Sequence, residues 1–181
     1  MASRLLNFAL YQTGWFCCVL GAAQDRPWLG AASATALLLV HVALVRQRGR
    51  EVRLLLAAGL IGGAVDSVQS CFGLLDFQGG RTIGCLAPAW ITVMWMQFAT
   101  LFRFGLAFLS GRYVLAAVLG GLGGPLAFWT GERLGAVEFA NPAWHSLVVL
   151  AAVWAVAFPI LLWLAGARRT TMRAVAYRGF S

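Results

Sequence analysis

Apolar residues dominate the chain in six long runs, which short polar connections separate. A run of about 20 predominantly apolar residues is long enough to cross the hydrocarbon core of a bilayer as an α-helix. The six runs cover residues 5–23, 28–45, 54–75, 86–109, 113–130 and 146–165. The pattern predicts an all-α, polytopic membrane helix bundle of six transmembrane helices, which forms a single integral membrane domain over residues 1–181.

The polar connections alternate in their arginine content, and this alternation predicts an orientation. Cytoplasmic connections of membrane proteins carry an excess of basic residues. With the N-terminus inside, the inner segments hold Arg4, Arg46, Arg48, Arg50, Arg53, Arg112, Arg168, Arg169, Arg173 and Arg178, whereas the outer ones hold Arg26, Arg81 and Arg133. We therefore expect both termini to be cytoplasmic.

The composition agrees with a membrane protein and excludes some partners. Only 11% of residues are charged, against about 25% in a soluble domain. The formal net charge of +8 comes from arginines that lie between apolar runs rather than on one basic face. Nucleic-acid binding is therefore not expected, and the expected partners are the lipid bilayer and anionic headgroups on the arginine-rich side.

The third run carries an acidic residue, Asp66, close to its middle. At 100° per residue, Gly59, Gly63 and Ser70 share one helical stripe with it. An ionised carboxylate at the centre of a bilayer costs roughly 2.5–3.5 kcal/mol on insertion scales. We therefore expect this stripe to face other helices or a cavity.

A second intramembrane charge, Arg103, lies in the fourth run and leaves three overlapping interpretations open. Asp66 can pair with Arg103, because buried charges in membranes usually find partners. It can also be protonated and hydrogen-bonded to polar neighbours, or it can serve a proton relay or headgroup contact. The candidate intramembrane polar site comprises Asp66, Gln69, Ser70, Gln97, Arg103 and Gln12.

Small residues predict where helices approach one another. Gly120 and Gly124 are spaced i, i+4 in the fifth run, a spacing that allows close helix contact. Pro125 follows them and removes a backbone hydrogen bond, so a break that lines a substrate path is an alternative to simple packing. Gly59 and Gly63 are predicted packing positions of the third run.

Cys71 and Cys85 flank the second outer connection. They can form a disulfide in an oxidising compartment if their Cα atoms approach within about 7 Å, which the sequence leaves open. The two histidines, His41 and His145, lie at opposite predicted depths, and no Cys or His pair has zinc-ligand spacing. Phosphate-loop, nucleophile-elbow and metalloprotease motifs are absent from the sequence, so no cofactor or metal is predicted.

The C-terminal residues 165–181 combine arginines with Met172, Tyr177 and Phe180. On a helix, several of these residues would share one face at i, i+3 and i+4 spacing. We expect this tail to lie along the inner membrane surface, with its arginines at the level of the phosphates. A solvated tail that only fixes the topology is the alternative.

Several sequence segments carry a family resemblance. They are NFALYQTGWF at 7–16, DS at 66–67, APAW at 87–90 and GPLA at 124–127. With them, nearly the whole chain resembles a family of small bacterial inner-membrane proteins catalogued as a domain of unknown function, numbered twenty-eight seventy-eight. The resemblance implies a multi-pass protein of the bacterial inner (plasma) membrane with a link to lipid metabolism.

Three classes of function fit these features. The first is a lipid-metabolism-linked accessory protein without chemistry of its own, which would act with a membrane enzyme as its partner. The second is a membrane-embedded enzyme that acts on a lipid or a lipid-like substrate. The third is a small carrier or lipid flippase, for which six short helices would have to form a homodimer. The short connections and missing motifs favour the first class.

Overall fold

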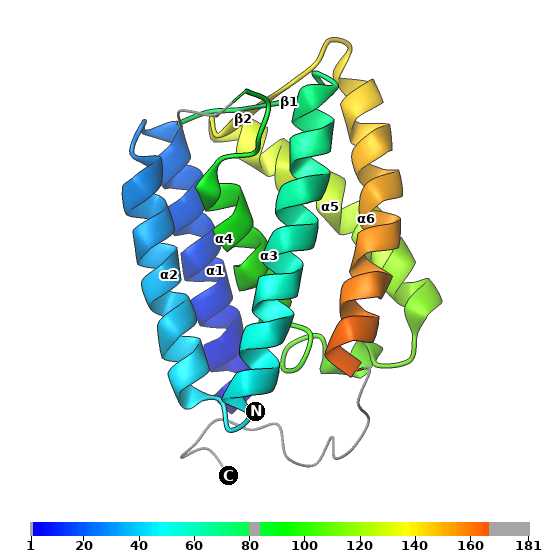
Figure 1. Ribbon diagram of the computed structural model, residues 1–181. Coiled ribbons are helices and arrows are strands. Elements are labelled where there is room, and N and C mark those ends of the chain that lie inside the picture. The colour runs from blue at the N-terminus through cyan, green and yellow to red at the C-terminus, as the bar shows by residue number, and fades with distance from the viewer. Residues whose placement is uncertain (1, 80–83, 167–181) are drawn as a thin grey trace.

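The computed structural model describes residues 2–79 and 84–166, which form a bundle of six α-helices. These are α1 (Ala2–Ala23), α2 (Pro27–Leu44), α3 (Arg48–Cys71), α4 (Ala89–Ala99), α5 (Tyr113–Arg133) and α6 (Ala143–Gly166). All except α4 are long and apolar enough to cross a membrane. The predicted polytopic helix bundle is confirmed (Figure 1).

The fourth predicted span is corrected by the structure. The run at 86–109 was expected to be one helix, but α4 has only 11 residues. Such a helix is about 16 Å long, and the hydrocarbon core is about 30 Å thick. After Ala99 the chain continues through tight turns into a short 3-10 helix, η1 (Ala107–Leu109).

The Asn7 side chain supports the backbone at the end of α4. Its Nδ2 donates to the carbonyl of Thr100 at 3.2 Å, and its Oδ1 accepts from the amide of Gly105 at 3.4 Å. The Thr100 hydroxyl bonds the carbonyl of Gln97 at 2.7 Å and so competes with the helical pattern. Non-helical backbone at membrane depth is tolerated only where protein surrounds it, and these bonds meet that requirement.

The helices pack as neighbouring pairs around α4. α1 lies beside α2 and α5 beside α6, while α4 contacts α1, α2 and α3. In Figure 1, α5 runs obliquely behind α3 and α6. Gly59 of α3 faces α4 so closely that an added Cβ would lie 2.6 Å from the Met96 methyl carbon. Gly120 of α5 likewise lies against Trp154 and Phe158 of α6.

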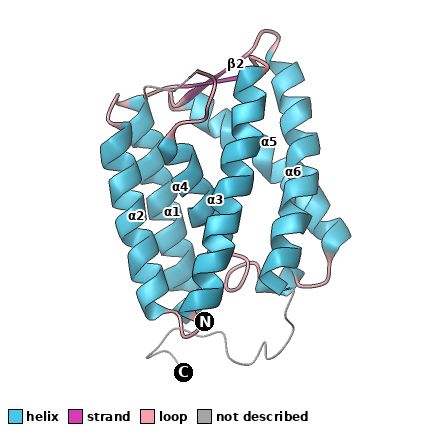
Figure 2. Ribbon diagram, in the orientation of Figure 1, coloured by secondary structure: helices cyan, strands magenta, loops and turns pink. Residues whose placement is uncertain are grey.

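A two-stranded antiparallel sheet closes one end of the bundle (Figure 2). It pairs β1 (Leu75–Phe77) with β2 (Val137–Phe139). Cys71 and Cys85, whose bonding the sequence left open, form a disulfide with their Cα atoms 4.8 Å apart. This bond ties the end of α3 to the chain that leads into α4.

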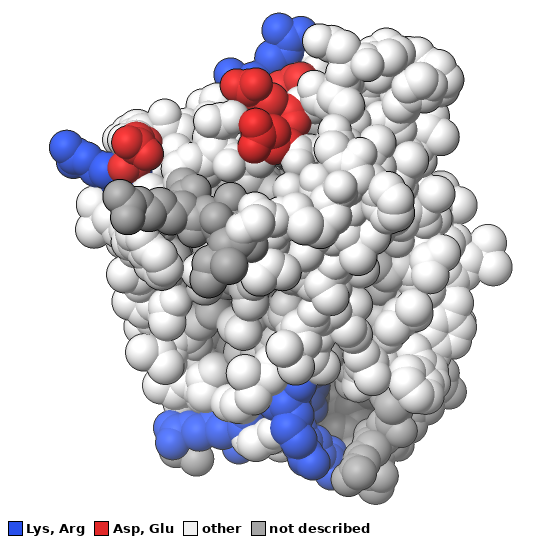
Figure 3. Space-filling model, turned by 45° about the horizontal axis from the view of Figure 1, so that its top comes forward, with Lys and Arg blue, Asp and Glu red and all other residues white. Residues whose placement is uncertain are grey.

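The two ends of the bundle differ in charge. The end with the strands carries the acidic side chains that Figure 3 shows in red. The acidic residues there are Asp25, Asp76, Glu132 and Glu138. The opposite end carries Arg46 and Arg112 in the connections before α3 and α5, and Arg48, Arg50 and Arg53 in the first two turns of α3. The tail that was predicted to lie on the membrane surface begins at the end of α6 and, after Gly166, lies outside the described residues.

Candidate functional site

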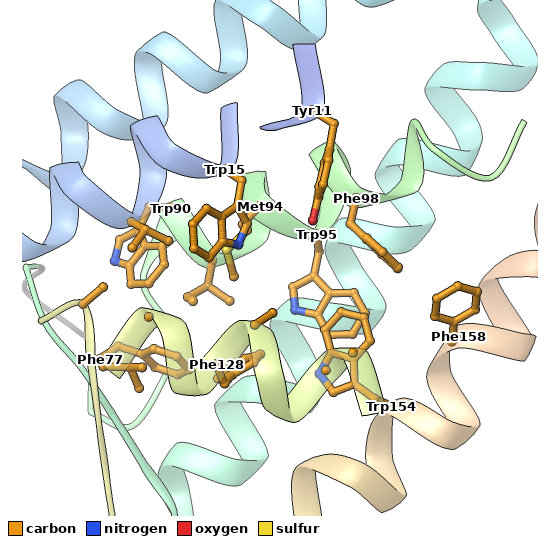
Figure 4. A pocket seen from close by; sticks show the side chains of 18 of the residues that line it. Tyr11, Trp15, Phe77, Trp90, Met94, Trp95, Phe98, Phe128, Trp154 and Phe158 are labelled. Carbon is orange, nitrogen blue, oxygen red and sulfur yellow. The ribbon is translucent and has the colours of Figure 1, made fainter. Parts of the chain in front are cut away.

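An aromatic cavity of about 230 Å³ lies between α1, α4, α5, α6 and the strand pair. Figure 4 shows its lining side chains converging from these elements. Aliphatic side chains and glycines complete the walls, so the interior is predominantly apolar. The aromatic lining residues are Tyr11, Trp15, Phe77, Trp90, Trp95, Phe98, Phe128, Trp154 and Phe158.

The rings of this cavity support one another. Trp95 of α4 and Trp154 of α6 stack with their centroids 4.4 Å apart and an interplanar angle of 11°. Phe98 packs edge-on against Trp154 at 5.2 Å and against Phe158 at 5.4 Å. Offset-stacked and edge-to-face pairs are the favoured aromatic geometries. The wall is therefore a rigid, mutually packed set of rings.

Asp66 lies behind this wall and holds its central ring. The Trp95 indole Nε1 donates to Asp66 Oδ2 at 2.7 Å, and Gln69 Nε2 donates to Asp66 Oδ1 at 2.9 Å. Asp66 is fully buried, but it does not itself line the cavity. The Asp66 side chain thus fixes the orientation of a cavity-wall side chain through a direct hydrogen bond.

Two glycines make room for the stacked indoles. Gly62 of α3 lies directly against the Trp95 ring, and Gly124 of α5 lies directly against Trp154. A methyl group at either position would overlap ring atoms. Gly63, one residue further along α3, faces the Thr92 hydroxyl of α4 instead. Gly123, Gly124 and Ala127 of α5 line the cavity, and Pro125 lies inside the same stretch of helix without lining it.

The Asp66–Arg103 pair, one of the three interpretations that the sequence left open, is not formed. Arg103 Nη1 instead donates to Glu51 Oε2 at 3.0 Å, and Arg103 Nη2 donates to Gln47 Oε1 at 3.2 Å. The expectation assumed that the fourth helix continues to Arg103. Because α4 ends at Ala99, the chain places Arg103 beside the start of α3 rather than beside Asp66.

Glu51 is the centre of this second polar cluster. It is fully buried, and its Oε1 lies 2.9 Å from Nε2 of His41, which is also buried. The sequence had placed His41 only at a different predicted depth from His145. Its ring also packs edge-on against Phe104 with centroids 5.4 Å apart. A carboxylate, a guanidinium and an imidazole therefore meet where α2, α3 and the turns after α4 come together.

The other predicted polar residues separate from Asp66, except for Gln69. Gln97 donates from Nε2 to the carbonyl of Ala34 on α2 at 2.7 Å. Ser70 and Gln12 are half-buried on α3 and α1. The structure thus brings together Asp66 and Gln69 from the predicted site, and it adds Trp95 as the partner that organises them.

Three supporting residues were missed by sequence reasoning. Glu51 stands among four arginines in the sequence, and this isolation was a signal that it neutralises one of them. Asn7 lies in an apolar run, where a buried amide needs a partner. Gly62 lies one residue from Gly63, the predicted packing position, and it is Gly62 that meets the Trp95 ring. The partners of all three residues are distant in sequence, which a single sequence does not reveal.

The site geometry suits binding by shape more than by charge. The polar atoms of the cavity wall belong to aromatic side chains. One of them is the Tyr11 hydroxyl, which points toward Trp95 in Figure 4. Within residues 2–79 and 84–166, no three His, Cys, Asp or Glu side chains gather closely enough to hold a metal ion. The arrangement can hold an apolar group between flat rings.

Comparison with known proteins gives one match. A family model described as "Protein of unknown function (DUF2878)" matches residues 4–160. No curated protein matches the chain, and no solved structure matches it. The match covers most of the described bundle, including the aromatic cavity and both buried carboxylates.

Proposed function

The chain belongs to the DUF2878 family of unknown function, and on that premise we propose that it binds the apolar part of a lipid or lipid-like molecule. The observation that carries the proposal is the apolar cavity of about 230 Å³ with its stacked Trp95 and Trp154. Apolar pockets with few polar groups are the usual form of small-molecule sites. The volume suits a segment of a lipid rather than a whole one.

The physics of the bilayer narrows what the cavity can select. A lipid tail already lies in hydrocarbon, so entering the cavity brings little hydrophobic free energy. Selectivity must come from shape and from contact with preorganised rings. We therefore expect the cavity to prefer an unsaturated, flat or kinked segment over a straight saturated one.

Among the three classes, the site supports an accessory or carrier-like binding role best. Asp66 is committed to Trp95 and Gln69, and the indole separates its carboxylate from the cavity. A membrane enzyme acting on the same lipid, or a second copy of this chain, is the proposed partner. The proposed location is the inner membrane of a bacterium.

Photolabelling tests the proposed binding. The full-length protein in phosphatidylcholine liposomes is irradiated with an oleic acid that carries a diazirine, and labelled peptides are mapped by mass spectrometry. We expect label on α1, α4 and α5 at cavity residues. Met94→Trp fills the cavity and should lower labelling about fivefold, a loss of ~1 kcal/mol. Leu126→Trp, on the exposed face of α5, is the matched control and should have no effect. Equal labelling of every lipid-facing helix, unchanged by Met94→Trp, would contradict the proposal.

The proposed topology places both termini in the cytoplasm. The arginine-rich end of the bundle would face inward, and the β1–β2 end would face outward. Reporter fusions after Gln78 and after Phe139 should both give an extracytoplasmic signal. A cytoplasmic signal at either position would exclude this orientation.

A further inference from the structure

A second pocket lies at the arginine-rich end of the bundle, where α3, the turns after α4 and the end of α6 meet. Its volume is about 200 Å³. Three arginines line it: Arg50, Arg53 and Arg103. The rest of the lining is apolar and comes from Leu54, Ala57, Leu164 and Ala165. The pocket therefore combines a cationic part with an apolar wall between α3 and α6.

Two of the guanidinium groups meet at one neutral oxygen. Gln47 Oε1 accepts from Arg103 Nη2 at 3.2 Å and from Arg50 Nη1 at 3.0 Å. The third arginine is placed by its own helix, because Arg53 Nε donates to the carbonyl of Gly49 at 3.1 Å. The side chains are thus held in place by bonds that leave further N–H donors available, since each guanidinium has five.

The positive charge of this pocket is only partly neutralised. Glu51 compensates Arg103, and it shares its carboxylate with His41. In the described part of the chain, Arg50 and Arg53 have no carboxylate within ion-pair distance. The positive charges of Arg50, Arg53 and Arg103 repel one another, and an anion placed between them offsets that repulsion. Guanidinium groups match phosphate oxygens in geometry as well as in charge.

We propose that this pocket binds the phosphate of an anionic phospholipid headgroup, with Arg50 and Arg53 as the ligand-binding cations and Arg103 as a third donor. The apolar wall next to the arginines fits the start of an acyl chain, which a free phosphate would not use. Leu54 and Ala57 lie further along α3 toward the middle of the bundle, so this wall leads from the charged end into the membrane-spanning part. The site is separate from the aromatic cavity, and it stands or falls independently of the function proposed above.

The test compares two double variants of equal charge. Arg50→Gln/Arg53→Gln removes the pocket cations and leaves the Arg103–Glu51 pair intact. Arg46→Gln/Arg48→Gln removes two exposed arginines from the same region without touching the pocket. Native mass spectrometry of the detergent-purified full-length protein measures binding of phosphatidylglycerol and phosphatidylcholine with identical chains.

We expect the wild-type protein to prefer phosphatidylglycerol, and the pocket variant to bind it about 10–30-fold more weakly, as two arginines near an anionic headgroup imply. The control variant should stay within about threefold of wild type. Equal losses in both variants, or no preference for phosphatidylglycerol in wild type, would overturn the site. Competition by inorganic phosphate at equal concentration would overturn the lipid as its source.

Discussion

Asp66 and Glu51 are both fully buried carboxylates on α3, yet they take opposite kinds of partner. Glu51 pairs with a guanidinium and an imidazole, whereas Asp66 accepts hydrogen bonds from an indole and an amide. They lie 15 residues apart, about 22 Å along the helix. The difference teaches that the side chains packed against each end of α3 decide the partner of a buried acid in this bundle.

The partners of Glu51 and Asp66 differ because different groups surround the two residues. Glu51 occupies the first turn of α3, where the helix dipole favours a negative charge and where arginines reach it from the membrane surface. Asp66 lies five residues before the other end of α3, where none of the described residues forms an ion pair with it. Neutral donors from rigid side chains satisfy it there, and the same bonds fix the wall of the cavity.

The largest expected effect comes from breaking the charged cluster. Glu51→Gln leaves Arg103 enclosed without its counter-charge and should lower stability by about 3–5 kcal/mol. Adding Arg103→Gln to this variant should restore part of the loss. Thermal unfolding in detergent measures both, and Glu138→Gln on the exposed face of β2 is the control. If Glu51→Gln unfolds like the control, Glu51 does not neutralise a buried charge.

The second prediction concerns a substitution that crowds the Trp95 ring, whose indole bonds Asp66. Gly62→Ala places a methyl group within the volume of the Trp95 ring and should destabilise the protein by about 1–3 kcal/mol. It should also displace the indole and reduce photolabelling of the cavity. Gly49→Ala, in open space at the start of the same helix, is the matched control and should be neutral or slightly stabilising. Equal stability of the two variants would show that the Trp95 ring is not where the structure places it.

The smallest expected effect is the coupling between Asp66 and Arg103. Because they have separate partners, Asp66→Asn and Arg103→Gln should change stability additively, with a coupling energy below about 0.5 kcal/mol. The two single variants and the double variant, measured by the same unfolding assay, complete the cycle. If either change rescues the other, Asp66 and Arg103 form the direct ion pair that the sequence suggested.

The sequence predicts the bundle well because a membrane-spanning helix requires a long apolar run, which is visible in the sequence. It does not predict the end of α4, since apolar residues such as Phe102 and Phe104 serve buried turns as well as helices. The importance of Asp66 was visible from its position. Its bond to Trp95 was not, because it depends on how α3 and α4 are rotated against each other. The Glu51–Arg103 pair depends in turn on where α4 ends.

We propose that Asp66 acts by holding Trp95 in the cavity wall. Photolabelling of Asp66→Asn and Asp66→Leu tests this role most directly. Asn keeps an acceptor for the Trp95 indole, and its amide can pair with Gln69 if that side chain turns over. Leu leaves the indole N–H unsatisfied.

For both variants, label in the cavity is measured with the diazirine-bearing oleic acid and compared with wild type. We predict labelling of Asp66→Asn within about twofold of wild type and a loss of about fivefold or more in Asp66→Leu, equivalent to ~1 kcal/mol. If Asp66→Asn loses labelling as completely as Asp66→Leu does, the carboxylate itself is required, and its role is not to position Trp95.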